Sequence, residues 1–342
     1  MTSKYPVVLI PGDGIGPEVT KAVVEVLTAA NAPLEYIDRV AGLAAIDKGE
    51  DVMPNQTLAA IREHHVALKG PCTTPVGKGF TSVNVQLRQK LNLFAAIRPV
   101  RSLEGVPTRY ENVDLVIVRE NTEGLYSGVE NEIVPGVVTT LKIATIKGTE
   151  RIARRAFQYM QNRDRKKLTV FHKANIMKKS DGLFLDSVDK IHKTEFAETP
   201  YDTQIIDAGC MKLVQDPTKF DVLLMENFYG DVVSDLAAGL VGGLGVVPGA
   251  NIGHEDAVFE AVHGSAPDIA GQNKANPLAL LMSAVMMLNH ISETHNDATV
   301  KDVAENIKAA YNRTLAENQK TYDLGGKLTT DEFAQAVIKR LS

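Results

Sequence analysis

The sequence predicts an α/β fold with two domains, and three observations carry this prediction. Short runs of β-branched and other apolar residues alternate with longer segments in which apolar residues recur at helical spacing. An apolar fraction of 44% and a charged fraction of 23% are ordinary for a globular protein with a buried core. The length of 342 residues is enough for about two domains, although no change in composition marks a boundary.

The chain opens with a strand, a glycine loop and a helix, which is how a dinucleotide-binding unit begins. Val7–Ile10 is a β-branched run typical of a buried strand, and Pro17–Ala30 has the spacing of a helix. Asp38 follows at about the distance expected for an acid that binds a ribose hydroxyl. The G-x-G-x-x-G fingerprint fails, however, because Pro17 or Val19 stands where its third glycine is required. We therefore expect this loop to serve packing or another ligand.

Further elements follow in the same alternating order. The patterns predict helices at Leu58–His64, Val83–Leu91, Asp231–Val241 and Ala279–His290, and strands at Val113–Val118, Leu168–Phe171 and Val222–Met225. Ser82 is expected to cap the second of these helices. The segment EGLYSGVENEIVPGVVTTLKIAT alternates around turn residues, which predicts a β-hairpin long enough to reach a partner subunit. A methionine stripe in the last helix is expected in the core or at a subunit interface.

Composition argues against several functional classes. A net charge of −5 gives no reason to expect nucleic acid or a membrane surface as a partner. No apolar stretch is long enough to span a membrane. The apolar run in the first ten residues, MTSKYPVVLI, is too short for a signal peptide. The two cysteines do not make a disulfide framework and favour a reducing compartment. We therefore expect a cytoplasmic protein.

Several basic and polar residues are candidates for binding an acidic substrate. Asn84 and Arg88 are four residues apart and share a helix face. With Ser82, and with Arg98 and Arg119 further along, they could clamp a molecule that carries several carboxylates, because guanidinium pairs bidentately with carboxylate. The alternative is that these arginines are solvated on the surface.

Two residues are candidates for proton transfer. Tyr126, in RENTEGLY, is of a type that can donate a proton, although a single tyrosine is more often structural. Lys173 follows the strand LTVF, at the strand end where α/β enzymes place catalytic groups. A partly buried lysine can act as a base when burial lowers its pKa, and the alternative is a surface lysine.

Three aspartates are candidates for binding a metal. Asp231 and Asp235 are four residues apart, so both carboxylates lie on one side of a helix. Carboxylate oxygens suit Mg²⁺ or Mn²⁺ rather than zinc, and Asp207 could be a third ligand. The alternative is that the pair complements the dipole at the helix N-terminus.

Together these stretches resemble the metal-dependent β-decarboxylating dehydrogenases, which include isocitrate, 3-isopropylmalate, homoisocitrate and tartrate dehydrogenases. The resembling motifs run in order from PGDGIGPEV through KGPCTTPVGKG, SVNVQLRQKL, RPV, RENTEGLY, HKANIMK and NFYGDVVSD to EAVHGSAPDIAGQNKANP. The resemblance implies a two-domain isopropylmalate dehydrogenase-like fold without a G-x-G-x-x-G unit. Its large cofactor-binding domain would be 1–95 with 243–342, and its small domain 96–242 with a dimer clasp near 124–163.

The resemblance also implies a role for each candidate residue. Arg88, Arg98 and Arg119, with Ser82 and Asn84, would hold the substrate carboxylates. Asp231 and Asp235 would bind Mg²⁺ or Mn²⁺ together with Asp207 of the partner subunit. Lys173, also from the partner, would help to remove the hydroxyl proton, and Tyr126 would protonate carbon after loss of CO₂. The cofactor would contact Thr74, Glu260, His263, Gly264, Ser265, Ala266, Asp268, Ile269 and Asn276.

The residue types at two places favour one substrate and one cofactor over the alternatives in this family. Isopropylmalate enzymes carry apolar residues where this chain has Ser82 and Asn84, and burying an isopropyl group there would leave each polar group unpaired at a cost of about 1–3 kcal/mol. A third carboxylate would satisfy them, which favours isocitrate. Homoisocitrate, one methylene longer, is the main alternative. Asp268 and Ile269 favour NAD, because a carboxylate would repel a 2′-phosphate.

Two more alternatives remain at this stage. A tartrate- or malate-type enzyme with broad specificity would use the same residues. Some relatives of isocitrate dehydrogenases are regulatory subunits that bind ligands without catalysis, and such a chain would be expected to lack part of the catalytic set. The resemblance favours a catalytic homodimer that acts on a small tricarboxylate, with active sites shared between subunits.

Overall fold

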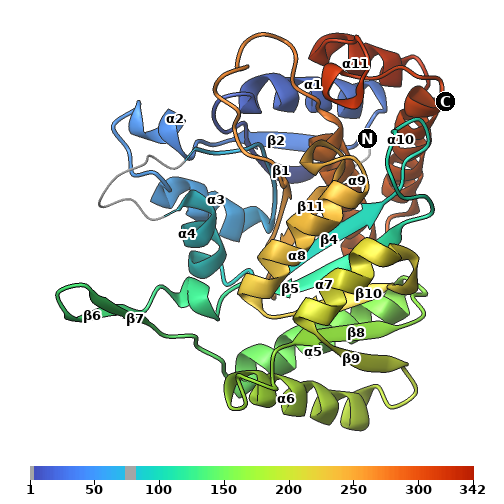
Figure 1. The fold of residues 1–342 in the computed structure, drawn as a ribbon. Coiled ribbons are helices and arrows are strands. Elements are labelled where there is room, and N and C mark those ends of the chain that lie inside the picture. Colours follow the sequence, from blue (N-terminus) through green and yellow to red (C-terminus); the bar gives the residue numbers. More distant parts are fainter. Residues whose placement is uncertain (1–3, 74–81) are drawn as a thin grey trace.

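The computed structural model describes residues 4–73 and 82–342, and its centre is one large twisted sheet covered by helices (Figure 1). The strands of this sheet are β1 (Tyr5–Ile10), β2 (Leu34–Asp38), β3 (Val66–Lys69), β4 (Ala95–Arg101), β5 (Asp114–Glu120), β8 (Leu168–His172), β9 (Tyr201–Ile205), β10 (Val222–Met225), β11 (Pro248–Ile252) and β12 (Ala257–Ala261). A separate hairpin is formed by β6 (Glu130–Val134) and β7 (Val137–Thr140).

Helices pack on both faces of the large sheet. They are α1 (Gly16–Ala29), α2 (Leu43–Ile46), α3 (Asn55–His64), α4 (Val83–Lys90), α5 (Ile146–Asn162), α6 (Ser180–Glu195), α7 (Ile206–Gln215), α8 (Asn227–Leu240), α9 (Leu278–His295), α10 (Ala298–Ala316) and α11 (Thr330–Ile338). Short 3₁₀ turns lie at Leu125–Ser127, Pro217–Lys219, Leu244–Val246 and Tyr322–Leu324. Among the described residues, no helix combines the length and the apolar character that a membrane crossing requires.

The strand order brings the two ends of the chain together. It runs β2-β1-β3-β12-β11-β4-β5-β10-β8-β9, so the N-terminal strands share one half of the sheet with the C-terminal β11 and β12. Pairing is parallel in both outer parts, whereas β11 is antiparallel to β12 and β4, and β4 is antiparallel to β5. The predicted α/β fold is confirmed. Its division into domains at the boundaries given above stays a prediction.

The sequence patterns missed one short strand, and one local prediction is wrong. Val66–Lys69 forms β3, which pairs with β1 and β12 although it is only four residues long. Ser82 does precede α4, but its side chain makes no capping hydrogen bond. Short strands and caps depend on tertiary partners, which a local sequence pattern does not contain.

Helix α8 begins four residues earlier than expected. The side chain of Glu226 caps it by accepting hydrogen bonds from the backbone N–H groups of Phe228 and Tyr229. Asp231 therefore lies in the second turn and Asp235 in the third, beyond the reach of the helix N-terminus. The alternative interpretation of this pair as helix-dipole acids is wrong.

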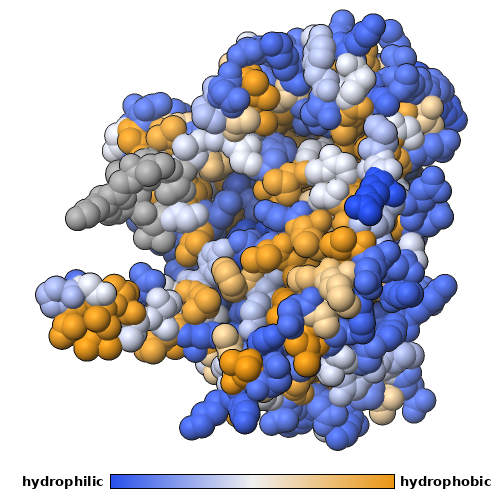
Figure 2. Space-filling model, viewed as in Figure 1, coloured by the Kyte–Doolittle hydropathy of each residue, from blue (hydrophilic) through white to orange (hydrophobic). Residues whose placement is uncertain are grey.

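The β6–β7 hairpin extends away from the body of the molecule (Figure 1). Its apolar side chains are largely exposed, with Ile133 at 64% and Val138 at 62% of full accessibility. A second exposed apolar area lies over α7 and α8, where Met211 and Val232 are more than half accessible. Both areas are visible as orange patches in Figure 2. The methionine stripe of α9 is instead mainly in the core, since Met282 and Met287 are buried.

Candidate active site

The predicted substrate residues and two of the three predicted metal ligands meet in one cavity of about 210 Å³. It is lined by all five predicted substrate residues, by Tyr126, Asp231 and Asp235, and by residues of β11 and β12. Side chains from α4, β4, β5 and α8 converge there, so segments distant in sequence build one site. In Figure 1, α8 lies in front of the sheet on this side.

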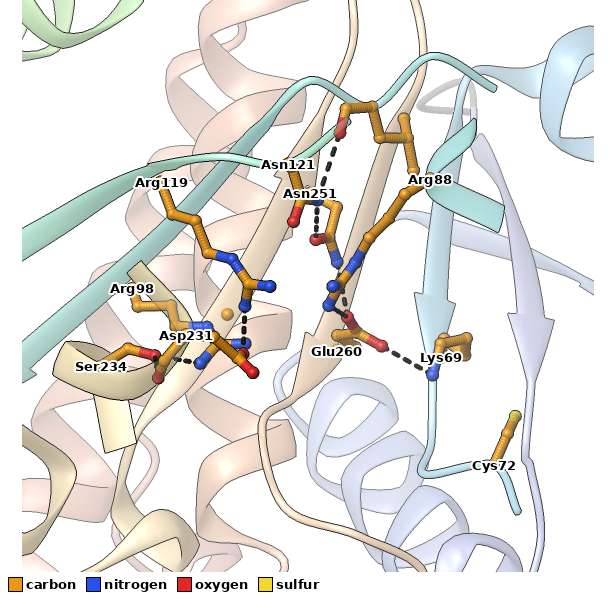
Figure 3. Close-up of polar contacts among 12 residues, drawn as sticks. Lys69, Cys72, Arg88, Arg98, Arg119, Asn121, Asp231, Ser234, Asn251 and Glu260 are labelled. Carbon is orange, nitrogen blue, oxygen red and sulfur yellow. Dashed lines mark hydrogen bonds and ion pairs between the residues drawn. The ribbon is translucent and has the colours of Figure 1, made fainter. Parts of the chain in front are cut away.

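All three arginines are buried rather than solvated, so the surface alternative is wrong. Arg119 is fully inaccessible, and its Nε and Nη2 atoms donate to the Oδ1 atom of Asn227 at 3.0 and 2.6 Å. Its Nη1 atom contacts the carboxylate of Asp231 (Figure 3). Arg98 contacts Ser234 and lies 3.4 Å from the carboxylate of Asp235. Burial and the neighbouring arginine charges lower the pKa of Arg98 to about 10, so the side chain stays cationic at neutral pH.

Arg88 belongs to a buried network that the sequence did not reveal. Its Nη2 atom lies 3.5 Å from Glu260, whose other carboxylate oxygen lies 2.6 Å from the Nζ atom of Lys69. The Nδ2 atom of Asn251 donates to Glu260 at 2.6 Å, and Asn121 donates to Asn251 at 3.0 Å (Figure 3). Burial would raise the pKa of Glu260, but the charges of Lys69 and Arg88 outweigh burial and lower it to about 2.

This network links the substrate cavity to strands of both halves of the sheet. Lys69 ends β3, Glu260 lies on β12 and Asn121 follows β5. A sequence signal for Lys69 exists, because a lysine that ends an apolar strand must find a counter-ion when it is buried. The signal does not name that counter-ion, since Glu260 is distant in sequence.

Tyr126 makes a polar contact in the cavity and does not serve packing alone. Its hydroxyl donates to the Oδ2 atom of Asp231 at 2.5 Å, and it lines the cavity. Burial, with the hydrogen bond to Asp231, raises the pKa of Tyr126, so the phenol keeps its proton at neutral pH. Burial also opposes ionisation of Asp231, but the charge of Arg119 and the bond from Tyr126 lower the pKa of Asp231.

The three predicted metal ligands are not brought together by one chain. Asp231 and Asp235 point from one face of α8 into the cavity. Asp207, on α7, pairs instead with Lys173 at 2.9 Å, and neither of these two residues lines the cavity. Within residues 4–73 and 82–342, no group of three or more histidine, cysteine, aspartate or glutamate side chains is arranged to hold a metal.

Most of the predicted cofactor residues lie in one loop, between β12 and α9. These are His263, Gly264, Ser265, Ala266, Asp268, Ile269 and Asn276. The Nε2 atom of His263 is buried and has no hydrogen-bond partner among the described residues. Asp268 is exposed. The remaining two residues are Glu260, which lies in the buried network, and Thr74, which lies outside the described residues.

The opening glycine loop supports this cofactor loop. The carboxylate of Asp13 accepts hydrogen bonds from the backbone N–H groups of Leu43, Ala44 and Thr73 at 2.7–2.9 Å. The backbone N–H of Ile15 donates to the carbonyl of Ser265 at 2.8 Å. The loop thus packs against α2, Thr73 and the cofactor loop through these hydrogen bonds.

Comparison with known proteins gives a consistent result. The model of the isocitrate/isopropylmalate dehydrogenase family matches residues 6–337. A Drosophila melanogaster protein named as a probable mitochondrial alpha subunit of NAD isocitrate dehydrogenase is 48% identical and covers 98% of this chain and 87% of its own length. A Dictyostelium discoideum protein named as a mitochondrial regulatory subunit of NAD isocitrate dehydrogenase is 46% identical over 98% of this chain and 92% of its own. The crystal structure of isocitrate dehydrogenase from Methylococcus capsulatus superposes with a TM-score of 0.93 at 46% identity, covering 98% and 99% of the two chains.

These findings correct one expectation and confirm another. The expected cytoplasmic location is contradicted, because both curated relatives are named as mitochondrial. The two cysteines, both free, argue only against an oxidising compartment and do not single out the cytoplasm. The predicted resemblance is confirmed by the match along nearly the whole length and by the shared fold. The chain belongs to the isocitrate/isopropylmalate dehydrogenase family.

Proposed function

We propose that this protein oxidises and decarboxylates isocitrate to 2-oxoglutarate and CO₂, with NAD as the hydride acceptor and a divalent metal. The observation that carries the proposal is the convergence of three arginines, Ser82 and Asn84 on the cavity that also receives Asp231 and Asp235. Relatives named as subunits of NAD isocitrate dehydrogenase support the same reaction.

The charge of the cavity supports a tricarboxylate. Arg98 and Arg119 are held in place by neighbours on α8, so little side-chain entropy remains to be lost when a substrate binds. The side-chain Oδ1 atom of Asn84 is buried without a hydrogen-bond partner among the described residues. A polar substrate group would supply that partner, whereas an isopropyl group would not.

The donor set fits a divalent metal if a second chain contributes. Asp231 and Asp235, with Asp207 of the partner subunit, would hold Mg²⁺ or Mn²⁺ through oxygen ligands. When bound, the metal would stabilise negative charge on the substrate oxygen during oxidation and decarboxylation. Tyr126 holds a proton next to Asp231 and would deliver it to carbon. Lys173 of the partner subunit would help to remove the hydroxyl proton.

The surface supports an association between chains. Lys173 and Asp207 lie outside the cavity of their own chain. The exposed apolar areas on the β6–β7 hairpin and on α7 and α8 (Figure 2) are of the kind that subunit interfaces bury. A homodimer is our proposal. Two relatives carry the names of an alpha and a regulatory subunit, which are terms for parts of a larger assembly, so sedimentation of the purified chain is the first test.

NAD rather than NADP is proposed from the cofactor loop. Asp268 is exposed there, and its carboxylate is suited to accept hydrogen bonds from the two ribose hydroxyls of the adenosine. The same charge would repel a 2′-phosphate. The unpartnered Nε2 atom of His263 supports a ligand at this loop independently.

The test is the initial rate of reduced-cofactor formation with Mg²⁺ for isocitrate, homoisocitrate and 3-isopropylmalate, each with NAD and with NADP. We expect isocitrate with NAD to be fastest by about tenfold or more. Faster turnover of homoisocitrate would keep the arginine clamp but show that the pocket is longer than proposed. Faster turnover of isopropylmalate would contradict the interpretation of Ser82 and Asn84.

A regulatory, non-catalytic role is the second candidate, because one relative is named as regulatory. It predicts that isocitrate binds to the purified chain without any turnover. Against it, Arg119, Tyr126, Asp231 and Asp235 are all present in the cavity. Calorimetric binding of isocitrate in a preparation without activity would favour this candidate over the enzyme.

A further inference from the structure

A second cavity, here called the rear cavity, has a volume of about 480 Å³. Its walls are formed by α5 on one side and by α9 and α10 on the other, and its floor by β4 and β11. Small-molecule sites typically have volumes of about 300–1,000 Å³. The rear cavity is therefore large enough for a ligand, and none of the roles proposed above uses it.

The sheet separates the rear cavity from the candidate active site. On β4, Arg98 lines the active site, whereas Ile97 and Pro99 line the rear cavity. On β11, Asn251 lines the active site and Ile252 the rear cavity. Because successive side chains of a strand point to opposite faces of a sheet, the two cavities lie on opposite sides of the same strands.

The lining of the rear cavity combines an apolar floor with a basic rim. Among the described residues, six arginine and lysine side chains but only three carboxylates line it, although the chain as a whole has a net charge of −5. Pro99, Met282 and Met286 contribute apolar surface. Such a combination suits a molecule with an acid group and an apolar body.

Two of these cations, Arg155 and Lys301, have no directly bonded side-chain partner among the described residues. Arg163 lies 2.5 Å from Glu293, and Arg165 and Lys308 also have carboxylate partners. The side chain of Arg155 on α5 makes no hydrogen bond or ion pair within the described residues, and its Nε atom is buried. Burial lowers the pKa of its guanidinium, and the charge of Glu293 offsets this only in part. A half-buried charge without a bonded counter-ion is costly, and a bound anion would remove that cost.

We propose that the rear cavity binds a small organic anion with an aromatic or other apolar body. The acid group lies against Arg155 and Lys301, and the body covers the floor beside Pro99 and Met286. Lys301 is exposed at the rim and also has no ion-pair partner within the described residues. The site is independent of the proposed function, because it is formed by residues to which that function gives no role.

Calorimetric titration of the full chain with 1-naphthyl phosphate tests this proposal. Arg155→Met is expected to weaken binding at least about tenfold, because a charged hydrogen bond is lost. The matched control is Arg154→Met, one residue away on α5, whose guanidinium pairs with Glu195 at 2.8 Å and does not line the cavity. The control should bind the probe within about twofold of the unmodified chain.

Further measurements keep the test decisive. If circular dichroism shows that Arg155→Met does not fold, a second pair of variants tests the proposal. Lys301→Met should bind the probe about threefold more weakly than the unmodified chain, whereas the exposed control Lys327→Met should not. Inorganic phosphate, which lacks an apolar body, should bind more weakly than the probe. Equal binding by a variant and its control would overturn the proposal. Displacement of the probe by isocitrate would also overturn it, by placing the probe in the active site.

Discussion

Two groups of predicted catalytic side chains differ in how a single chain holds them. In the cavity, Arg119 is fully buried and contacts both Asn227 and Asp231, and Tyr126 bonds to the same aspartate. Lys173 is instead partly exposed and Asp207, with which it pairs, is exposed, with side-chain accessibilities of 27% and 67%. The chain therefore encloses the residues proposed to hold substrate and leaves Lys173 and Asp207 more accessible.

The largest effect is expected at the pair of Lys173 and Asp207, where a substitution should lower activity without lowering stability. Lys173→Met should lower kcat by about 10²–10⁴-fold, because a proton-transfer group is lost. The melting temperature should hardly change, since exposed ion pairs contribute little to stability. Steady-state kinetics and thermal unfolding of the same preparation measure both. A loss of stability that accounts for the loss of rate would contradict the proposed role.

Mixing variants tests whether two chains share each site. Lys173→Met and Asp231→Asn should each be nearly inactive alone. In a mixed dimer, one site would combine an intact Asp231 with an intact Lys173 from the other chain. Co-refolding equal amounts should therefore restore about a quarter of the wild-type rate, which is half the sites in half the dimers. No recovery would mean that Lys173 serves its own chain.

The next largest effect is expected in the buried network of Lys69, Glu260 and Arg88. Lys69→Met should destabilise the fold by about 3–5 kcal/mol, because Glu260 is then left buried with less compensation for its charge. Lys21→Met, at an exposed lysine of α1, is the control and should change the free energy of unfolding little. Urea unfolding measures both variants. A cost below about 1 kcal/mol for Lys69→Met would show that Arg88 and Asn251 alone hold the carboxylate.

A smaller effect is expected for the geometry of the arginine clamp. Arg119→Lys keeps the charge but loses the planar fork that contacts Asn227 and Asp231. The KM for isocitrate should rise about tenfold to a hundredfold, with a smaller change in kcat. Arg109→Lys, at an arginine that does not line the cavity, is the control. An unchanged KM in Arg119→Lys would mean that charge alone binds the substrate.

The same division explains what the sequence could and could not predict. Residues in contiguous motifs, such as Asp231 and Asp235 four apart, were predicted to lie on one side of a helix, and they do. Lys69 and Glu260 were not paired in advance, because their ion pair is created when β12 lies beside β3 in the sheet. The role of Arg155 has no local signal, since its lack of a bonded partner is a property of the folded chain.

The smallest expected effect is a change in acid stability that belongs to Glu260. Its folded pKa of about 2 is below the value of 4.5 expected for an unperturbed glutamate. The stabilisation by its ionised form is therefore complete above about pH 4.5 and is lost as the pH falls towards 2. Glu260→Gln lacks this titration, so the stability difference between wild type and variant should shrink over that window, by on the order of 1–3 kcal/mol.

Urea unfolding at several pH values between about 5 and 2 measures this difference directly. Glu35→Gln, at an exposed glutamate of β2, serves as the control for the loss of one carboxylate. A difference for Glu260→Gln that stayed constant with pH would show that the carboxylate contributes through packing and hydrogen bonds alone. A difference that shrinks as the pH falls would show that the ionised network of Lys69, Glu260 and Arg88 stabilises the cavity before any substrate binds. This stabilisation distinguishes the network from the more accessible pair of Lys173 and Asp207.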